Sequence, residues 1–387
     1  MNIYEDLSTS LSDFIRVNIK VNEGNPNYIR PLDKDIKAVF DPTKNKLLKK
    51  GKVIRWLLKD DSNQLIGRIA AFINPRYKNK GDKFKVGGIG FFECTDDQDA
   101  ANLLFDTAKE WLTSEGVEAM DGPINFGERD RWWGLLVEGF HAPPYGLNYN
   151  PPYYQKLFET YGFQNFYNQI CWKMDLAREA QLSDKFYEAH KRIAADSDFK
   201  AIYLKKNKLE KFAADFCAVY NGAWASHEGN KAMAEAQAIK TFKQLKPIID
   251  ERLVWFVYHK DKPVAMWLNL PDINQIIKHL NGQFHLLAKL KFLIMKMRKS
   301  TNGMMGIVFG VIPEFQGTGV DYFMIVEGEK EIKKNTNYRT LELQWQGEFN
   351  PKILNVSKNL EAKKARTLVT YRYIFDREVE FVRHPIL

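Results

Sequence analysis

One order of strands and helices is predicted twice along the chain, and this repetition constrains the fold more than any other feature. In each half, two apolar runs flank a short polar break, at residues 60–63 and again at 259–262, which is typical of an antiparallel hairpin. A third strand, a helix, a strand, a second helix and a closing strand follow in both halves. The expected strands are 52–58, 64–73, 86–94, 117–120 and 168–174, then 253–258, 263–270, 304–312, 339–345 and 366–375, and the expected helices are 97–114, 153–161, 319–334 and 351–361.

This order predicts an α/β fold of the mixed α+β type, repeated in tandem. Helices that alternate with strands cover the faces of a sheet, and long crossover helices require part of each sheet to be parallel. A chain of 387 residues is about twice as long as one ordinary domain. We therefore expect two domains, residues 1–175 and 176–387, with a mostly helical bridge over 182–249.

The composition is that of a globular protein, with 45% hydrophobic and 27% charged residues. Residues 1–12 contain no apolar core and no run reaches membrane-spanning length, so neither a signal peptide nor a transmembrane helix is expected. The net charge of +9 favours anionic partners such as nucleotide cofactors, acidic lipids or nucleic acid, and does not choose among them.

The three cysteines, Cys94, Cys171 and Cys217, are too scattered for a disulfide framework or a zinc site. The seven histidines form no HExxH pair and no cluster at ligand spacing. The sequence therefore predicts a protein of the reducing cytoplasm without a metal site.

A glycine-containing turn joins a strand to a helix at residues 310–319, which read GVIPEFQGTG. Such a turn directs free backbone N–H groups at one point, and the helix dipole adds partial positive charge there. It is therefore suited to bind a pyrophosphate. The alternative is an ordinary turn in which the glycines only permit a positive φ angle.

This turn resembles the coenzyme A loop of the GNAT acyltransferase superfamily, which reads Gln or Arg, two residues, Gly, one residue, then Gly or Ala. Residues 316–321, QGTGVD, follow that order, with Asp321 in place of the last small residue. Val311 and Pro313 match the family's Val-x-Pro, and Glu348-x-Asn350 resembles its later Asn segment. The resemblance covers nearly the whole chain, which is similar to a bacterial tandem-domain family of unassigned substrate. It implies acetyl-CoA or a longer acyl-CoA as cofactor. The implied cofactor-binding residues are Val311, Ile312, Gln316, Gly317, Thr318, Gly319, Val320 and Asn350.

The equivalent turn of the first half, Glu93 to Asp97, has no glycine and is acidic, so it should repel a pyrophosphate. The first domain is thus expected to be a degenerate partner that shapes the substrate side.

Acyl transfer needs a base for the amine, a backbone donor for the thioester and an acid for the thiolate. The N–H near Val311 or Ile312 is the expected donor. Glu342, which alternates with apolar neighbours on its strand, is the candidate base; the alternative, which the pattern favours, is a solvated or helix-paired strand face. The position where the family often has a tyrosine acid counts to Ser357, so Tyr322, Tyr371 or water is expected to serve instead.

Two further clusters are weaker candidates. Glu128, Asp130 and Arg131 adjoin two tryptophans in a long loop, and His227-Glu228 follows Trp224. The alternatives are a surface loop pinned by tryptophans and an ordinary helix end.

A basic amphipathic helix is predicted over Lys278 to Lys299, inserted near residues 275–300. Its apolar stripe comprises Leu280, Phe284, Leu287, Leu290, Ile294 and Met297. Such a helix could lie on an anionic membrane or line an acyl-chain site, or it could simply face the core.

Three functions fit these observations. The leading one is an acyl-CoA-dependent N-acyltransferase acting on a small or amphipathic amine bound between the halves. The alternatives are a non-catalytic ligand- or membrane-binding protein that retains the fold, and an aminoacyl-tRNA-dependent transferase, for which the insertion is short. We therefore expect nucleic acid to be an unlikely partner, whereas peripheral contact with an anionic membrane fits the basic helix.

Overall fold

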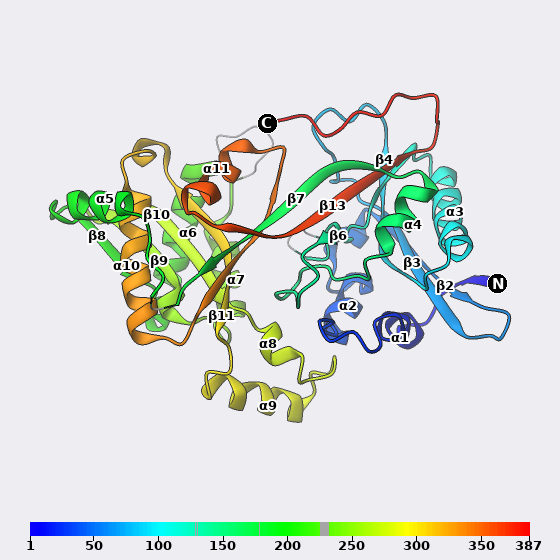
Figure 1. Ribbon diagram of the computed structural model, residues 1–387, viewed down its shortest axis with the longest axis horizontal. Helices are drawn as coiled ribbons and strands as arrows, with labels where there is room; N and C mark the ends of the chain where they lie inside the picture. The colour runs from blue at the N-terminus through cyan, green and yellow to red at the C-terminus, as the bar shows by residue number, and fades with distance from the viewer. Residues whose placement is uncertain (128, 130, 178, 225–231) are drawn as a thin grey trace.

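The strands of both halves join into one mixed sheet that runs through the whole molecule (Figure 1). The computed structural model describes the chain except residues 128, 130, 178 and 225–231. Within the described residues the strand order is β1-β2-β3-β4-β5-β13-β7-β12-β11-β10-β9-β8, with β6 paired to β13. The strands are β1 Asn2–Glu5, β2 Lys52–Lys59, β3 Leu65–Ile73, β4 Val86–Cys94, β5 Ala119–Gly122, β6 Leu135–Glu138, β7 Gln164–Asp175, β8 Phe199–Tyr203, β9 Val254–His259, β10 Lys262–Pro271, β11 Gly303–Val311, β12 Thr340–Gly347 and β13 Lys363–Ile374.

Among the described strands, β4 pairs with β5 and β11 pairs with β12 in parallel, one such pair in each half. Each is joined by a crossover helix, as the sequence predicted, so the expected α/β fold with a mixed sheet is confirmed. The α-helices are α1 Ser12–Val21, α2 Asp33–Phe40, α3 Gln98–Ser114, α4 Tyr154–Tyr161, α5 Asp184–Ala194, α6 Leu209–Trp224, α7 Glu235–Leu245, α8 Asn274–Ile277, α9 Leu286–Met297, α10 Val320–Asn335 and α11 Pro351–Asn359.

The two halves exchange their closing strands. β13, from the end of the chain, lies between β5 and β7, whereas β7 pairs with β12 of the second half. The long ribbons of β7 and β13 cross the centre of the molecule together (Figure 1). Residues of the two sequence halves therefore meet along these strands, and the boundary between residues 175 and 176 stays a prediction.

The crossover helices form because their apolar residues recur at helical spacing. In α3, the Asp97 side chain accepts hydrogen bonds from the N–H groups of Asp99 and Ala100 and so caps the helix. The predicted stripe of α3, from Ala101 to Leu112, is fully buried against the first half of the sheet. In the second half, α10 covers one face of β9 and β10 and α6 covers the other.

The insertion differs from the predicted single helix. Asn281 and Gly282 adopt positive φ angles of 48° and 73°, and this turn separates the short α8 from α9. An Asn-Gly pair favours such a turn over a helix, which explains the break. Leu287, on the predicted stripe, is exposed on α9 and does not face the core. The structure also adds β1, α1, α2, β6 and β8, which periodicity alone did not predict.

Among the described residues, no helix combines the length and the apolar character that crossing a bilayer requires.

Candidate functional site

A cavity opens where β11 and β12 diverge. Their parallel ladder joins Gly303 to Thr340 and ends at Gly306 and Leu343. Beyond that point, the edge of β11 that had paired with β12 lines a cavity of about 480 Å³ through Ile307 to Phe309, while its other edge stays paired with β10. Helices α10 and α11 close its other sides, and most of the lining is apolar. The apolar lining includes Trp267, Ile307, Phe309, Leu343, Val356 and Leu360.

Several features of the cavity suit a long thioester cofactor. An exposed strand edge offers backbone N–H and C=O groups to the amides of a ligand lying along it. Among the described residues, the buried Oε1 atom of Gln344 has no hydrogen-bond partner, and Gln344 lines the cavity. The residues present therefore fit an amide-bearing chain that ends in an apolar acyl group.

The predicted glycine turn lies at the N-terminus of α10. Gly317 and Gly319 have φ angles of 73° and 95°, which glycine adopts without strain. A Cβ atom at Gly317 would meet nothing within 4 Å, so the outer side of the turn is open. The Thr318 Oγ1 atom donates to the carbonyl of Phe315 at 2.7 Å, and the Gln316 side chain donates to the carbonyl of Val311 at 3.0 Å.

A cation from another helix reaches the same turn. Arg192, on α5, donates from Nη2 to the carbonyl of Thr318 at 2.9 Å. The turn thus combines a helix N-terminus with a guanidinium group, and both attract an anion. Val320 is fully buried and anchors the helix, while Asn350 caps α11 by accepting from the N–H of Ile353.

Asp321 lies in the first turn of α10. Burial raises the pKa of this carboxyl, against the opposing effect of the N–H groups of Tyr322 and Asp321 itself. Its carboxylate therefore shares the N-terminal donors that a bound anion would use.

Glu342 belongs to a buried polar cluster that joins the two halves. The Arg366 guanidinium, from β13, is fully buried and donates from Nε to Glu342 Oε1 at 2.6 Å. His141 Nε2 lies 3.7 Å from Glu342 Oε2, and its side chain is 44% exposed. Burial opposes the ionisation of Glu342, but His141 and Arg366 outweigh it and lower the pKa of this carboxyl. The cluster therefore presents a carboxylate beside an accessible imidazole.

Asp272 lies near this cluster at the end of β10. Its Oδ1 atom accepts from the N–H groups of Asn274 at 3.1 Å and Tyr145 at 3.3 Å. Burial raises the pKa of Asp272 to about 6, and the Glu342 charge acts in the same direction.

The remaining predicted residues are scattered. Tyr322, in the first turn of α10, packs against Phe186 with ring centroids 4.2 Å apart and the planes tilted by 38°, and it does not line the cavity. Tyr371 lies in the core of the first half and donates to Glu159 Oε1 at 2.8 Å, so the structure does not bring it to the cavity. Ser357 is buried, lines the cavity and donates to Gln346 Oε1 at 2.9 Å.

The weaker clusters add little to the site. Glu128, Asp130 and His227-Glu228 lie outside the described residues, and Arg131 packs over the Tyr145 ring at 5.4 Å. Within the part of the chain that the structure describes, no group of His, Cys, Asp and Glu could hold a metal ion.

In the acidic turn of the first half, the carboxylate of Glu93 is already bound by side chains of the protein. Glu93 is buried, pairs with Arg68 at 3.3 Å and accepts from the Tyr154 hydroxyl at 2.7 Å. Sequence reasoning missed His141, Arg366 and Asp272. An arginine within the apolar closing strand was the available signal, because a buried guanidinium requires a partner.

The chain was compared with known proteins on this basis. No family model matches it. A tandem GNAT protein from the clavulanic acid biosynthesis pathway superposes with a TM-score of 0.54 over 97% of this chain and 98% of that one, at 9% identity. The chain has the tandem GNAT fold.

A second structure with the GNAT fold agrees. The glucosamine N-acetyltransferase region of a fungal multi-domain GH3 β-N-acetylglucosaminidase gives a TM-score of 0.55 at 11% identity, covering 96% of this chain and 38% of that one. At such identities these likenesses show the tandem GNAT fold alone.

Two curated bacterial proteins are similar in sequence. The bacterial ceramide synthase of Caulobacter vibrioides is 25% identical over 93% of this chain and 94% of its own length. Protein YghO of Escherichia coli is 23% identical over 80% of this chain and 78% of its own. The first of these names denotes an acyltransferase.

Proposed function

We propose that this protein is an N-acyltransferase that moves an acyl group from acyl-CoA to the amine of an amphipathic acceptor. The observation that carries the proposal is the apolar cavity of about 480 Å³ between β11 and β12, which Phe309 of β11 lines just before the chain enters the glycine turn of α10. This volume is within the range of small-molecule sites, and its apolar lining suits an acyl chain longer than acetyl.

The cofactor would be held by residues already described. The turn at Gly317 to Gly319, with Arg192, would hold the pyrophosphate, and the free edge of β11 up to Val311 would bind the amides and the thioester carbonyl. Coenzyme A supplies the acyl group as a thioester, so amide formation breaks its C–S bond and releases a thiol. Ile312, Gln316, Val320 and Asn350 shape and brace this site.

The polar cluster on β12 would serve the amine. Glu342 is ionised at neutral pH because its pKa is lowered, so it attracts an ammonium group. The accessible His141 imidazole beside it would then take the proton that makes the amine nucleophilic. This assigns Glu342 mainly to anchoring the acceptor. Tyr322 or water stays the proposed donor to the leaving thiolate.

The acceptor class follows from the similar sequence. Ceramide is an N-acylated long-chain amino alcohol, and the bacterial ceramide synthase matches 93% of this chain. A long-chain amine is therefore the acceptor we propose. Such acceptors reside in membranes, so the reaction calls for contact with a lipid surface, which is one of the two roles that the basic insertion suggests.

The experiment measures thiol release from acyl-CoA esters of increasing chain length with a long-chain amino alcohol as acceptor. We expect long-chain esters to be preferred, and Val356→Trp, which fills the cavity, to reduce their turnover more than that of acetyl-CoA. Leu354→Trp is the matched control, since Leu354 is on the same helix but does not line the cavity.

Two results would count against this function. Absence of thiol release with every ester would favour a binding protein that retains the fold. Equal effects of the two tryptophan variants would mean that the cavity does not hold the acyl chain.

A further inference from the structure

Helix α9 presents an apolar face to solvent. Leu286, Leu290, Leu293 and Met297 recur at helical spacing and form one stripe, which Leu287 and Ile294 widen. These six side chains are between 36% and 81% exposed. The opposite side of the helix is buried through Ala288 and Phe292, which pack with α8 and with Leu32 of the first half. A continuous apolar face of this kind marks a surface that binds a partner.

Cations border this face on both sides. At about 100° per residue, Lys289 and Lys296 lie along one border of the stripe and Lys291 lies along the other. From residue 273 to residue 313 the sequence has six lysines and arginines and no acidic residue. The ammonium groups of Lys291 and Lys296 donate to the carbonyls of His279 and Pro247, so these two cations are held at the borders of the stripe. Basic charge along the edge of an apolar helix face attracts anionic headgroups.

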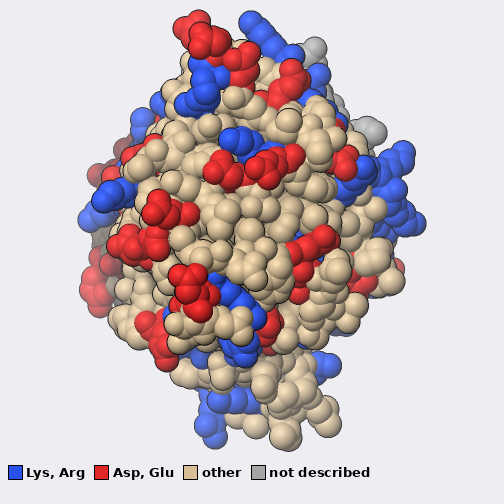
Figure 2. Space-filling view, turned by 90° about the vertical axis from the view of Figure 1, so that its right-hand side faces the viewer, with Lys and Arg blue, Asp and Glu red and all other residues tan. Residues whose placement is uncertain are grey.

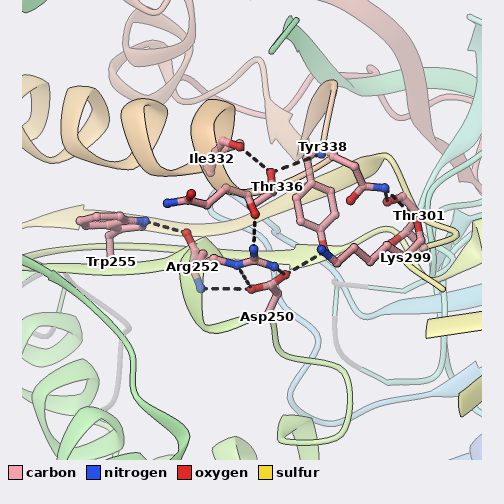
Figure 3. Close-up of polar contacts among 10 residues, drawn as sticks. Asp250, Arg252, Trp255, Lys299, Thr301, Ile332, Thr336 and Tyr338 are labelled. Atoms are coloured by element: carbon pink, nitrogen blue, oxygen red, sulfur yellow. Dashed lines mark hydrogen bonds and ion pairs between the residues drawn. The ribbon is translucent and has the colours of Figure 1, made fainter. Parts of the chain in front are cut away.

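The helix is firmly held, so its exposed face is a lasting property of the fold. Asn337, next to β12, donates to the carbonyls of Lys299 at 2.7 Å and Thr301 at 3.1 Å, just after α9. Close by, Arg252, paired with Asp250 just before β9, donates to the carbonyl of Asn335 at the end of α10, and the Tyr338 hydroxyl donates to Asp250 (Figure 3). This network fixes the base from which the insertion projects.

The position of α9 suits docking on a flat surface. The helix lies at one extreme of the molecule, away from the main sheet (Figure 1). In the perpendicular view, the corresponding lowest part shows basic and uncharged side chains and no acidic ones (Figure 2). An anionic lipid surface matches both the apolar stripe and the basic borders, whereas the flanking lysines would repel each other in a symmetric contact between two copies.

We propose that α9 is an in-plane membrane anchor that docks this protein on anionic lipid, with the leucine stripe inserted among the acyl chains. The anchor deepens the proposed function, on which its purpose rests, because it brings the enzyme to an acceptor that resides in the membrane. Binding itself requires no acyl transfer, so it can be measured alone.

The test is co-sedimentation of the full chain with vesicles of phosphatidylcholine containing one-third phosphatidylglycerol. We expect binding that weakens with salt and on pure phosphatidylcholine. The double variant Leu290→Ser/Leu293→Ser should weaken it by more than about tenfold, because burying one leucine accounts for about that factor. Leu7→Ser is the matched control, since Leu7 is 78% exposed on another surface.

The outcomes separate this proposal from the proposed function. Vesicle binding that depends on the stripe supports the anchor even if no acyl-CoA ester is turned over. Turnover of a soluble amine without vesicle binding would overturn the anchor and leave the enzyme intact. Self-association that the double variant abolishes, without lipid binding, would also overturn it and assign the face to a second copy.

Discussion

Replacing Gly317 by glutamate tests whether the turn before α10 binds the cofactor pyrophosphate. Gly317 is exposed, has φ of 73°, and has open space where a Cβ atom would project. Gly116 provides a matched control, because it is exposed, has φ of 71°, and has equally open space in the first half. Each variant should lose about 1–2 kcal/mol of stability through backbone strain alone.

The two variants should differ in coenzyme A binding. A carboxylate about 6 Å from a pyrophosphate bearing about two charges costs about 1.4 kcal/mol even at the dielectric constant of water. That repulsion raises the dissociation constant about tenfold. At a ligand concentration about 100 times the original dissociation constant, the ligand's stabilisation would fall from about 2.7 to about 1.4 kcal/mol.

Isothermal titration calorimetry with acyl-CoA, together with thermal unfolding with and without it, measures both effects. We expect Gly317→Glu to weaken binding at least about tenfold and Gly116→Glu to leave it unchanged. If both variants bind acyl-CoA as the original protein does, the pyrophosphate does not lie at this turn and the reasoning is refuted.

Three further predictions follow from the polar clusters. Glu342→Gln should raise the KM of the acceptor amine about 100-fold, because the anchoring charge is lost, and leave the dissociation constant of acyl-CoA unchanged; an unchanged KM would remove Glu342 from acceptor binding. His141→Gln should lower kcat about 100-fold and leave the dissociation constant of acyl-CoA unchanged; an unchanged kcat would exclude the imidazole as base. Asp272, whose pKa is raised to about 6, favours folding when protonated, and this advantage is lost as the pH rises through about 6. Asp272→Asn should therefore become more stable than the original protein by up to about 3 kcal/mol between about pH 4 and pH 7; a difference independent of pH in denaturant unfolding would contradict this.

The sequence predicted most of the local structure correctly. The hairpin breaks, the stripe of α3 and the glycine turn of α10 each depend on residues close together in the chain, and all appear as expected. The insertion was misjudged because Asn281 and Gly282 interrupt the apolar periodicity with a turn. The sequence-based catalytic residues stay predictions, with Tyr371 placed away from the cavity.

The sequence by itself determined the repeated α/β pattern and the position of the glycine turn before α10, because caps, glycines and apolar spacing act within one segment. The tertiary structure alone decided the rest. The exchange of β7 and β13 brings Arg366 to Glu342 and His141, which lie far apart in the chain. Only the packed sheet shows that β11 and β12 diverge around a cavity. The stripe on α9 has the same spacing whether it meets a core or a membrane, so only its neighbours in space reveal that it faces outward.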